Sequence, residues 1–307
     1  MMNRPKTNLG VTIGKLRLAN PIICASGTFG FGEELRGFVD FGSVGAIATK
    51  TITLEPRAGN PPPRIFETEC GVINSVGLEN PGVDKFISEK LKAMREIDTK
   101  FIISVGGGSI FEYSKIVQRL DETKDVDAIE VNLSCPNIKN KKIVSQDKKE
   151  TYKVVKALRK VTSKTLIAKI TPEVSDIVSV AVAAQDAGAD ALALVNTFFA
   201  MAINIETAKP YIGNIYGGYS GPAIKPMSLY RVWRVASVVK IPVIGGGGIT
   251  DADAAIEFLL AGATAVSLGT VNLVYPNKAK EVLAGIIEYM RRKNIKDINK
   301  LRGSMNV

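Results

Sequence analysis

The sequence predicts an α/β protein, a (β/α)8 TIM barrel, because apolar β-rich runs alternate with helical patterns eight times along its 307 residues. Apolar strands separated by single helices are typical of a parallel sheet that is covered on both faces. A Gly-rich turn at 245–248 follows the seventh strand, whereas a doubly wound fold carries its phosphate-binding glycines after the first. We therefore expect residues 1–307 to form a single barrel domain with long insertions after strands 2 and 6.

The predicted strands and helices follow one another in order along the chain. The strands cover residues 21–26, 45–51, 101–105, 128–133, 166–171, 191–196, 241–245 and 265–269. The helices cover residues 32–41, 84–97, 111–122, 148–161, 174–187, 227–239, 252–261 and 278–292. Gly188 and Gly262 lie in the near-repeats DAGADA and LAGATA, where a glycine is suited to end a helix.

Residues 52–81 and 198–225 form connections too long for ordinary strand-to-helix loops. The first is rich in proline, and the second is rich in tyrosine and glycine. Both follow strands, so both are expected on the C-terminal face of the barrel, where barrel enzymes hold their ligands. We interpret them as walls or lids over a site, each with room for a small β excursion. The alternative is a pair of disordered linkers.

Polar residues or glycines stand at the C-terminal end of every predicted strand, and in a barrel these ends converge. The fourth strand is the most distinctive, since it runs out into Asn132, Cys135 and Asn137, with a proline between the last two. A structural cysteine in a turn is the alternative interpretation. The strand-end groups are Ser26, Lys50, Ser104, Asn132 with Cys135, Lys169, Asn196 with Thr197, 246–248, and Gly269 with Thr270.

The last two units indicate a phosphate site. The glycines at 245–248 allow a phosphate to approach the backbone, and residues 267–270 offer further amides. A merely flexible turn is the alternative. Lys50 and Lys169 would place cations near such a ligand, where they would stabilise negative charge that develops on it. A salt bridge in the barrel mouth, or Schiff-base chemistry, would also account for these lysines.

Composition excludes several classes of chemistry. The chain has no histidine, so it has no histidine base, catalytic triad or histidine metal ligand. Its three cysteines, Cys24, Cys70 and Cys135, are too scattered for a disulfide framework, and we expect no metal site. The net charge of +10 arises largely from 139–160, where from Glu150 onward the charges interleave with apolar residues as on a solvated helix face, and we expect no nucleic-acid partner. Without an apolar leader or membrane span, the chain is expected in the cytoplasm.

Six motifs together closely resemble those of the dihydroorotate dehydrogenases, in the soluble class whose barrel subunit binds FMN, and the resemblance covers nearly the whole chain. The motifs are Ala-Thr-Lys-Thr (48–51), Asn-Ser-Val-Gly-Leu (74–78), Asn-Leu-Ser-Cys-Pro-Asn (132–137), Asn-Thr (196–197), Ser-Gly-Pro-Ala (220–223) and 245–248. The resemblance implies FMN as cofactor and oxidation of dihydroorotate to orotate in pyrimidine biosynthesis.

The family's residue roles then carry over to matching positions. Cys135 would be the catalytic base that removes a proton from the substrate ring. Substrate would be bound by Lys50, Asn74, Ser75, Val76, Gly77, Leu78, Asn132, Asn137, Asn196 and Thr197. FMN would be held by Ser26, Lys50, Thr51, Ser104, Asn132, Lys169, Val195, Gly221, Gly247, Gly248, Gly269 and Thr270. Ser104 departs from the family, which usually offers an asparagine toward the flavin.

The resemblance is greatest to the two-subunit, NAD-linked type. It implies a homodimer of barrels within a heterotetramer, in which a partner subunit carries FAD and a 2Fe-2S cluster. We expect no NAD site in this chain itself, and fumarate or another electron acceptor is the alternative. Other functional classes also fit a barrel with these residues: a tRNA dihydrouridine synthase, a lysine-dependent phosphosugar lyase or isomerase, and a non-catalytic barrel subunit.

Overall fold

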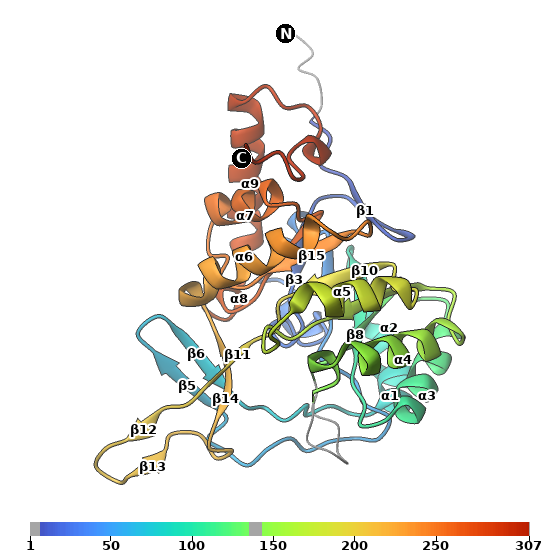
Figure 1. The fold of residues 1–307 in the computed structure, drawn as a ribbon, viewed down its shortest axis with the longest axis vertical. Helices are drawn as coiled ribbons and strands as arrows, with labels where there is room; N and C mark the ends of the chain where they lie inside the picture. Colours follow the sequence, from blue (N-terminus) through green and yellow to red (C-terminus); the bar gives the residue numbers. More distant parts are fainter. Residues whose placement is uncertain (1–6, 135–142, 307) are drawn as a thin grey trace.

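The computed structural model describes residues 7–134 and 143–306 and contains a closed barrel of eight parallel strands (Figure 1). Each strand pairs with the next along the chain, and the last pairs with the first. The barrel strands are β3 (Ile22–Cys24), β4 (Ala46–Ala48), β7 (Lys100–Val105), β8 (Ala128–Asn132), β9 (Thr165–Lys169), β10 (Ala191–Leu194), β15 (Val243–Gly246) and β16 (Ala265–Leu268). The predicted fold class is therefore confirmed, with all eight strands within the predicted ranges or one residue outside them.

Helices cover the outside of the barrel. They are α1 (Val83–Lys85), α2 (Leu91–Met94), α3 (Ile110–Asp121), α4 (Lys148–Arg159), α5 (Ile177–Asp186), α6 (Lys225–Ala236), α7 (Ala252–Leu260) and α9 (Lys278–Arg292). The short helix α8 (Val271–Val274) instead lies at the C-terminal end of the barrel, just after β16. A π-helical turn, Phe86–Lys90, joins α1 to α2 in the segment predicted as one helix. Gly188 and Gly262 follow α5 and α7 with φ of 101° and 113°, as expected of helix-ending glycines.

The prediction of a helix at 32–41 was wrong. The segment forms two short 3₁₀ turns, Glu33–Leu35 and Phe41–Ser43, and Gly32 and Gly37 have φ of 86° and 81°. Backbone in this left-handed region cannot continue a right-handed helix. The short helix α8 was not predicted, since four residues are too few to show helical periodicity.

The two long insertions meet in one antiparallel sheet, which we call the roof sheet. Its order is β11 (Phe198–Ala200), β14 (Gly217–Ser220), β6 (Gly71–Asn74) and β5 (Ile65–Thr68). The small β excursion expected in each insertion is thus present, but the two pair with each other. A Cβ on Gly71 would lie 2.2 Å from the Ser220 carbonyl oxygen, so this close strand approach requires glycine.

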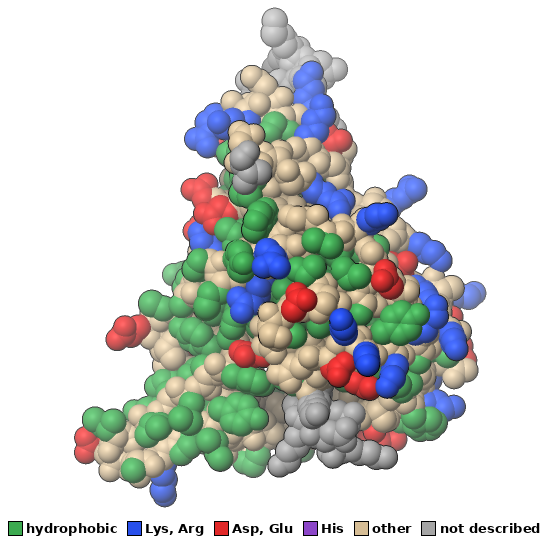
Figure 2. All heavy atoms as spheres, in the orientation of Figure 1, with side chains coloured by type: hydrophobic (Ala, Val, Ile, Leu, Met, Phe, Trp, Pro, Cys, Tyr) green, Lys and Arg blue, Asp and Glu red, His purple; other side chains and the backbone are tan. Residues whose placement is uncertain are grey.

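Two hairpins complete the structure. The hairpin of β1 (Val11–Ile13) and β2 (Leu16–Leu18) lies at the N-terminal end of the barrel, where the Lys15 N–H donates to Thr165 Oγ1 at 2.9 Å. The hairpin of β12 (Ile203–Asn204) and β13 (Lys209–Pro210) projects beyond the roof sheet (Figure 1). Hydrophobic side chains gather around this projection and the roof sheet at the lower left of Figure 2. No helix among the described residues has both the length and the apolar character of a membrane span.

Candidate active site

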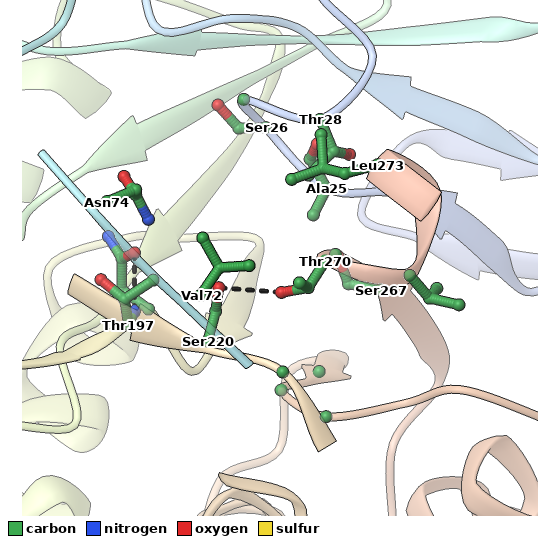
Figure 3. Close-up of a pocket in the computed structure, with 18 of the residues that line it drawn as sticks. Ala25, Ser26, Thr28, Val72, Asn74, Thr197, Ser220, Ser267, Thr270 and Leu273 are labelled. Carbon is green, nitrogen blue, oxygen red and sulfur yellow. Dashed lines mark hydrogen bonds between the residues drawn. The ribbon is translucent and has the colours of Figure 1, made fainter. Parts of the chain in front are cut away.

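A cavity of about 1310 Å³ lies between the C-terminal ends of the barrel strands and the roof sheet. All eight barrel strands, or the loops that follow them, contribute residues to its lining. Figure 3 shows two groups of these side chains: Ser26 and Thr270 follow barrel strands, whereas Asn74 and Ser220 belong to the roof sheet. The cavity therefore occupies the face on which barrel enzymes bind their ligands.

Glycines leave the backbone bare at one end of the cavity. Gly247 and Gly248 have φ of 113° and 86°, and a Cβ on Gly247 would lie 2.4 Å from Ser228 Oγ. A Cβ on Gly269 would find its nearest neighbour at 4.0 Å, which means that the backbone there faces open space. Thr270 Oγ1 donates to Ser220 Oγ at 2.8 Å and so links this end to the roof sheet (Figure 3). Bare backbone beside hydroxyl groups is suited to a phosphate.

Asparagine and threonine side chains gather at another part of the lining. Asn196 Nδ2 donates to Asn132 Oδ1 at 3.3 Å, and Asn196 Oδ1 accepts from the Thr197 N–H at 2.8 Å. In the roof sheet, Asn74 Nδ2 donates to the Gly218 carbonyl at 3.2 Å. These groups supply hydrogen-bond donors and acceptors without net charge, which suits a planar amide or imide ligand.

The two predicted lysines both line the cavity but differ in their surroundings. Lys169 Nζ lies 3.5 Å from Glu130 Oε1, and both side chains are nearly buried. Lys50 Nζ lies 4.0 Å from Glu79 Oε2, and that carboxylate makes a closer pair with Arg64 at 2.6 Å. Both lysines thus have an acidic neighbour, as the salt-bridge interpretation anticipated, and Lys50 has the looser partner.

Most of the predicted site residues that the structure describes come together around this cavity. The predicted residues in its lining are Ser26, Lys50, Thr51, Asn74, Val76, Gly77, Leu78, Asn132, Lys169, Val195, Asn196, Thr197, Gly221, Gly247, Gly248, Gly269 and Thr270. Cys135 and Asn137 lie outside the described residues, so their predicted roles stay predictions.

Ser75 and Ser104 do not line the cavity, in contrast to the contacts expected of them. Ser75 Oγ accepts from Asn60 Nδ2 at 2.8 Å, because side chains alternate at the end of β6 and Asn74 takes the cavity side. Ser104 is fully buried behind the wall, where it hydrogen-bonds to Thr51 Oγ1 and Glu130 Oε1, each at 3.0 Å.

Sequence reasoning missed several parts of the lining, among them Glu130 and the hairpin of β5 and β6. Glu130 stands in the middle of an apolar strand, Glu67 and Thr68 end β5, and Glu69 and Cys70 form the turn from β5 to β6. A carboxylate inside an otherwise apolar strand itself indicates a buried charge with a partner nearby, since buried charges need partners. The β5–β6 turn gave no comparable signal, because its place depends on pairing between distant segments.

The described cysteines differ in exposure. Cys24 is fully buried in β3, and burial raises the pKa of its thiol far above the usual range. It therefore stays protonated and belongs to the core. Cys70 is exposed and lines the cavity from the roof sheet side.

Comparisons with known proteins agree over nearly the whole chain. The family model described as dihydroorotate dehydrogenase matches residues 8–290. A protein of Caldicellulosiruptor bescii named "Dihydroorotate dehydrogenase B (NAD(+)), catalytic subunit" is 50% identical, with 98% of this chain and 100% of that protein covered. Proteins of the same name are 48% identical in Thermoanaerobacter pseudethanolicus (98% and 99% covered) and 46% identical in Geobacter metallireducens (100% of both).

A solved structure agrees in fold. The crystal structure of dihydroorotate dehydrogenase from Eimeria tenella, in complex with ferulenol, has a TM-score of 0.80 and covers 99% of this chain and 90% of its own. Its sequence identity of 23% supports the shared barrel fold alone. From the family model and the full-length relatives, it follows that this chain belongs to the dihydroorotate dehydrogenase family.

Proposed function

We propose that this chain is the FMN-binding catalytic subunit of an NAD-linked dihydroorotate dehydrogenase, which oxidises dihydroorotate to orotate in pyrimidine biosynthesis. The observation that carries the proposal is the cavity, in which 17 of the residues predicted from the family resemblance come together. Full-length similarity to proteins named as catalytic subunits of this enzyme supports the same conclusion.

The residues present fit FMN. Gly269 offers bare backbone where a Cβ would stand in open space, as a phosphate-binding cradle requires. Gly247, Gly248 and Thr270 would hold the same phosphate, and Lys169 would lie near the flavin ring. FMN, when bound, supplies a two-electron acceptor for the oxidation.

The chain's own groups would bind and orient the substrate. Lys50 would pair with the substrate carboxylate, because it is the cation with the looser acidic partner. Asn132 and Asn196, already joined by a hydrogen bond, and Asn74 from the roof sheet would receive the ring amide groups. The roof sheet would exclude water from the reacting atoms.

Cys135 is the proposed base. It follows Asn132 by three residues in the sequence and matches the family's catalytic cysteine. Its Sγ, as the thiolate, would take the proton from the ring carbon next to the amide carbonyl of the substrate. A cysteine thiol has an ordinary pKa of about 8.5, so the base requires a lowered pKa or desolvation beside the substrate to act near neutral pH.

We also propose that electrons leave through a partner subunit that carries FAD and a 2Fe-2S cluster, within a heterotetramer built on a dimer of barrels. The similarity to catalytic subunits, a name that denotes a multi-subunit enzyme, supports this arrangement. Exposed apolar side chains around the roof sheet and α8, among them Phe199, Ile203 and Val274, supply surface of the kind that protein interfaces cover.

The test is the visible spectrum of the purified protein, followed without oxygen as dihydroorotate is added. A yellow protein that bleaches supports FMN, substrate and oxidation together. A yellow protein that does not respond to dihydroorotate would direct attention to another flavin-dependent reductase. A colourless protein that cannot be loaded with FMN would refute the proposal and favour lysine chemistry at Lys50 or Lys169.

Replacing the base gives the sharpest version of this test. Cys135→Ser should slow the bleaching by at least about 100-fold near neutral pH, because a positioned base contributes about 10²- to 10⁴-fold. Cys70→Ser is the matched control, since Cys70 also lines the cavity but has no proposed part in proton transfer. Equal slowing in both variants would contradict the assignment of Cys135.

A further inference from the structure

A line of polar side chains runs beside the cavity across five neighbouring barrel strands. Ser26, after β3, lies with its Oγ 3.4 Å from Thr51 Oγ1, and Thr51, after β4, lies 3.0 Å from Ser104 Oγ on β7. Ser104 donates to Glu130 Oε1 on β8 at 3.0 Å, and Glu130 lies 3.5 Å from Lys169 Nζ on β9. Each link joins one barrel strand to the next, and the line ends at Lys169.

Glu130 is the unusual member of this line. It stands in the middle of β8 and is only 5% exposed. A carboxylate removed from water is costly unless it is paired and hydrogen-bonded. Among the residues that the structure describes, Lys169 is the cation within 4.0 Å of Glu130, and Ser104 is the hydroxyl donor to it. The pair is therefore built into the barrel wall.

We propose that Glu130, held by Ser104, is a positioning residue that fixes the Lys169 ammonium at the cavity and offsets part of its charge. The proposal rests on the FMN-binding function above. Glu130 thus acts on the bound ligand through Lys169. Lys50, whose partner Glu79 lies farther away, keeps most of its charge available for an anionic ligand.

The pairing has a measurable consequence for bound FMN. Two-electron reduction makes the flavin more negative, so an uncompensated cation beside it favours the reduced form. Glu130 lowers this preference by neutralising part of the Lys169 charge. Removing the carboxylate should therefore raise the midpoint potential of the bound flavin, while removing Lys169 should lower it.

The experiment measures the midpoint potential of FMN in the purified, FMN-loaded protein, by anaerobic titration against a reference dye. For Glu130→Gln we expect the reduced form to gain about tenfold in binding relative to the oxidised form, which corresponds to a positive shift of about 30 mV for a two-electron couple. Ser104→Ala should shift the potential in the same direction by less, because it removes one hydrogen bond from Glu130. Glu150→Gln on α4 is the control, since it frees the exposed Lys153 on the same helix, outside the cavity lining, and should shift nothing.

A double-variant cycle distinguishes action through Lys169 from a direct effect of the carboxylate. In a Lys169→Met background Glu130 has no lysine charge left to offset, so adding Glu130→Gln should change little if the carboxylate acts through Lys169. A shift of equal size in both backgrounds would overturn the proposal.

Other outcomes are also decisive. If Glu130→Gln fails to fold, Ser104→Ala carries the test alone. Unchanged potentials in every variant that folds and holds FMN would refute the positioning role and leave the proposed function intact. A wild-type protein that binds no FMN would refute the proposed function and this inference with it.

Discussion

The barrel mouth and the roof sheet enclose the same cavity by different means. The mouth is the end of eight parallel strands whose core residues are buried on both faces, and its polar side chains are linked from strand to strand. The roof sheet has four short antiparallel strands, most of whose residues are half-buried or exposed. It depends on glycines for its fit: a Cβ on Gly217 would lie 2.4 Å from the Asn74 carbonyl oxygen. The barrel mouth thus supplies Lys50 and Lys169, and the roof sheet closes the cavity over them.

This contrast predicts that changes at the glycines of the mouth act on the cofactor and that changes at the glycines of the roof sheet act on the substrate. The largest effect is expected in the mouth. Gly269→Val would place a side chain in the open space beside the backbone. A side chain that fills the ligand's space in this way reduces the free energy of FMN binding by about 1–3 kcal/mol, which weakens the binding by about 5- to 150-fold.

Quenching of FMN fluorescence on binding to the FMN-free protein measures this change. Gly42→Val, in an exposed 3₁₀ turn, is the matched control and should bind FMN as the wild type does. Normal FMN affinity in Gly269→Val would mean that the phosphate lies elsewhere in the cavity.

A smaller effect is expected in the roof sheet. Gly218→Ala would place a Cβ 2.0 Å from Thr197 Oγ1 and push β14 away from the end of β10. We expect the KM for dihydroorotate to rise by about tenfold, equivalent to about 1.4 kcal/mol, while FMN content stays near one per chain.

Steady-state kinetics and the flavin absorbance of the same sample give both quantities. Thr207→Ala, in the turn of the β12–β13 hairpin, serves as the control for an insertion change away from the cavity. Loss of FMN in Gly218→Ala would break the division between mouth and roof sheet.

The smallest effect is expected away from both regions. Asp147 caps α4 by accepting from the Lys149 and Glu150 N–H groups, and these hydrogen bonds hold the pKa of its carboxyl below the ordinary value. Asp147→Ala should therefore lower the free energy of unfolding by about 1 kcal/mol at pH 7, without changing FMN binding.

The sign of the pH dependence follows from the lowered pKa. The stabilisation by Asp147 is complete above the pKa of the unfolded chain and is lost as the pH falls through the lower pKa of the folded state. Urea unfolding of both proteins at pH 7 and at pH 3 should show the difference between them shrinking. Asp176→Ala, which removes the cap of α5, offers a parallel measurement on a neighbouring helix.

Local patterns in the sequence were enough to predict the barrel mouth. Strand periodicity located the strands, and the residues just beyond them, such as Lys50 and Asn196, proved to line the cavity. The segment 32–41 failed because its glycines take left-handed backbone conformations that composition alone does not reveal. Ser104 could be placed on its strand, but which of its neighbours it contacts depends on the register with β8.

The roof sheet could not be predicted in the same way. Its central pairing joins Asn74 to Gly218, which are 144 residues apart, and β14 is short and rich in glycine. Such a strand has little intrinsic preference for a sheet, so its pairing is set by the barrel that brings the two insertions together. The lining residues from Glu67 to Cys70 were missed for this reason.

The pairing of β6 with β14 has a consequence for how the protein acquires its activity. The insertions follow β4 and β10, which stand four strands apart in either direction around a ring of eight, and so face each other across the barrel. The roof sheet can close only when both halves of the ring are in place. Contacts between segments so far apart in the sequence form late, because forming them carries the entropy cost of closing the long loop between the segments. A nascent or truncated chain that stops before Gly217 has six barrel strands but no partner for β6. Catalytic competence is therefore coupled to completion of the polypeptide, and an incomplete barrel presents no functional site to substrates.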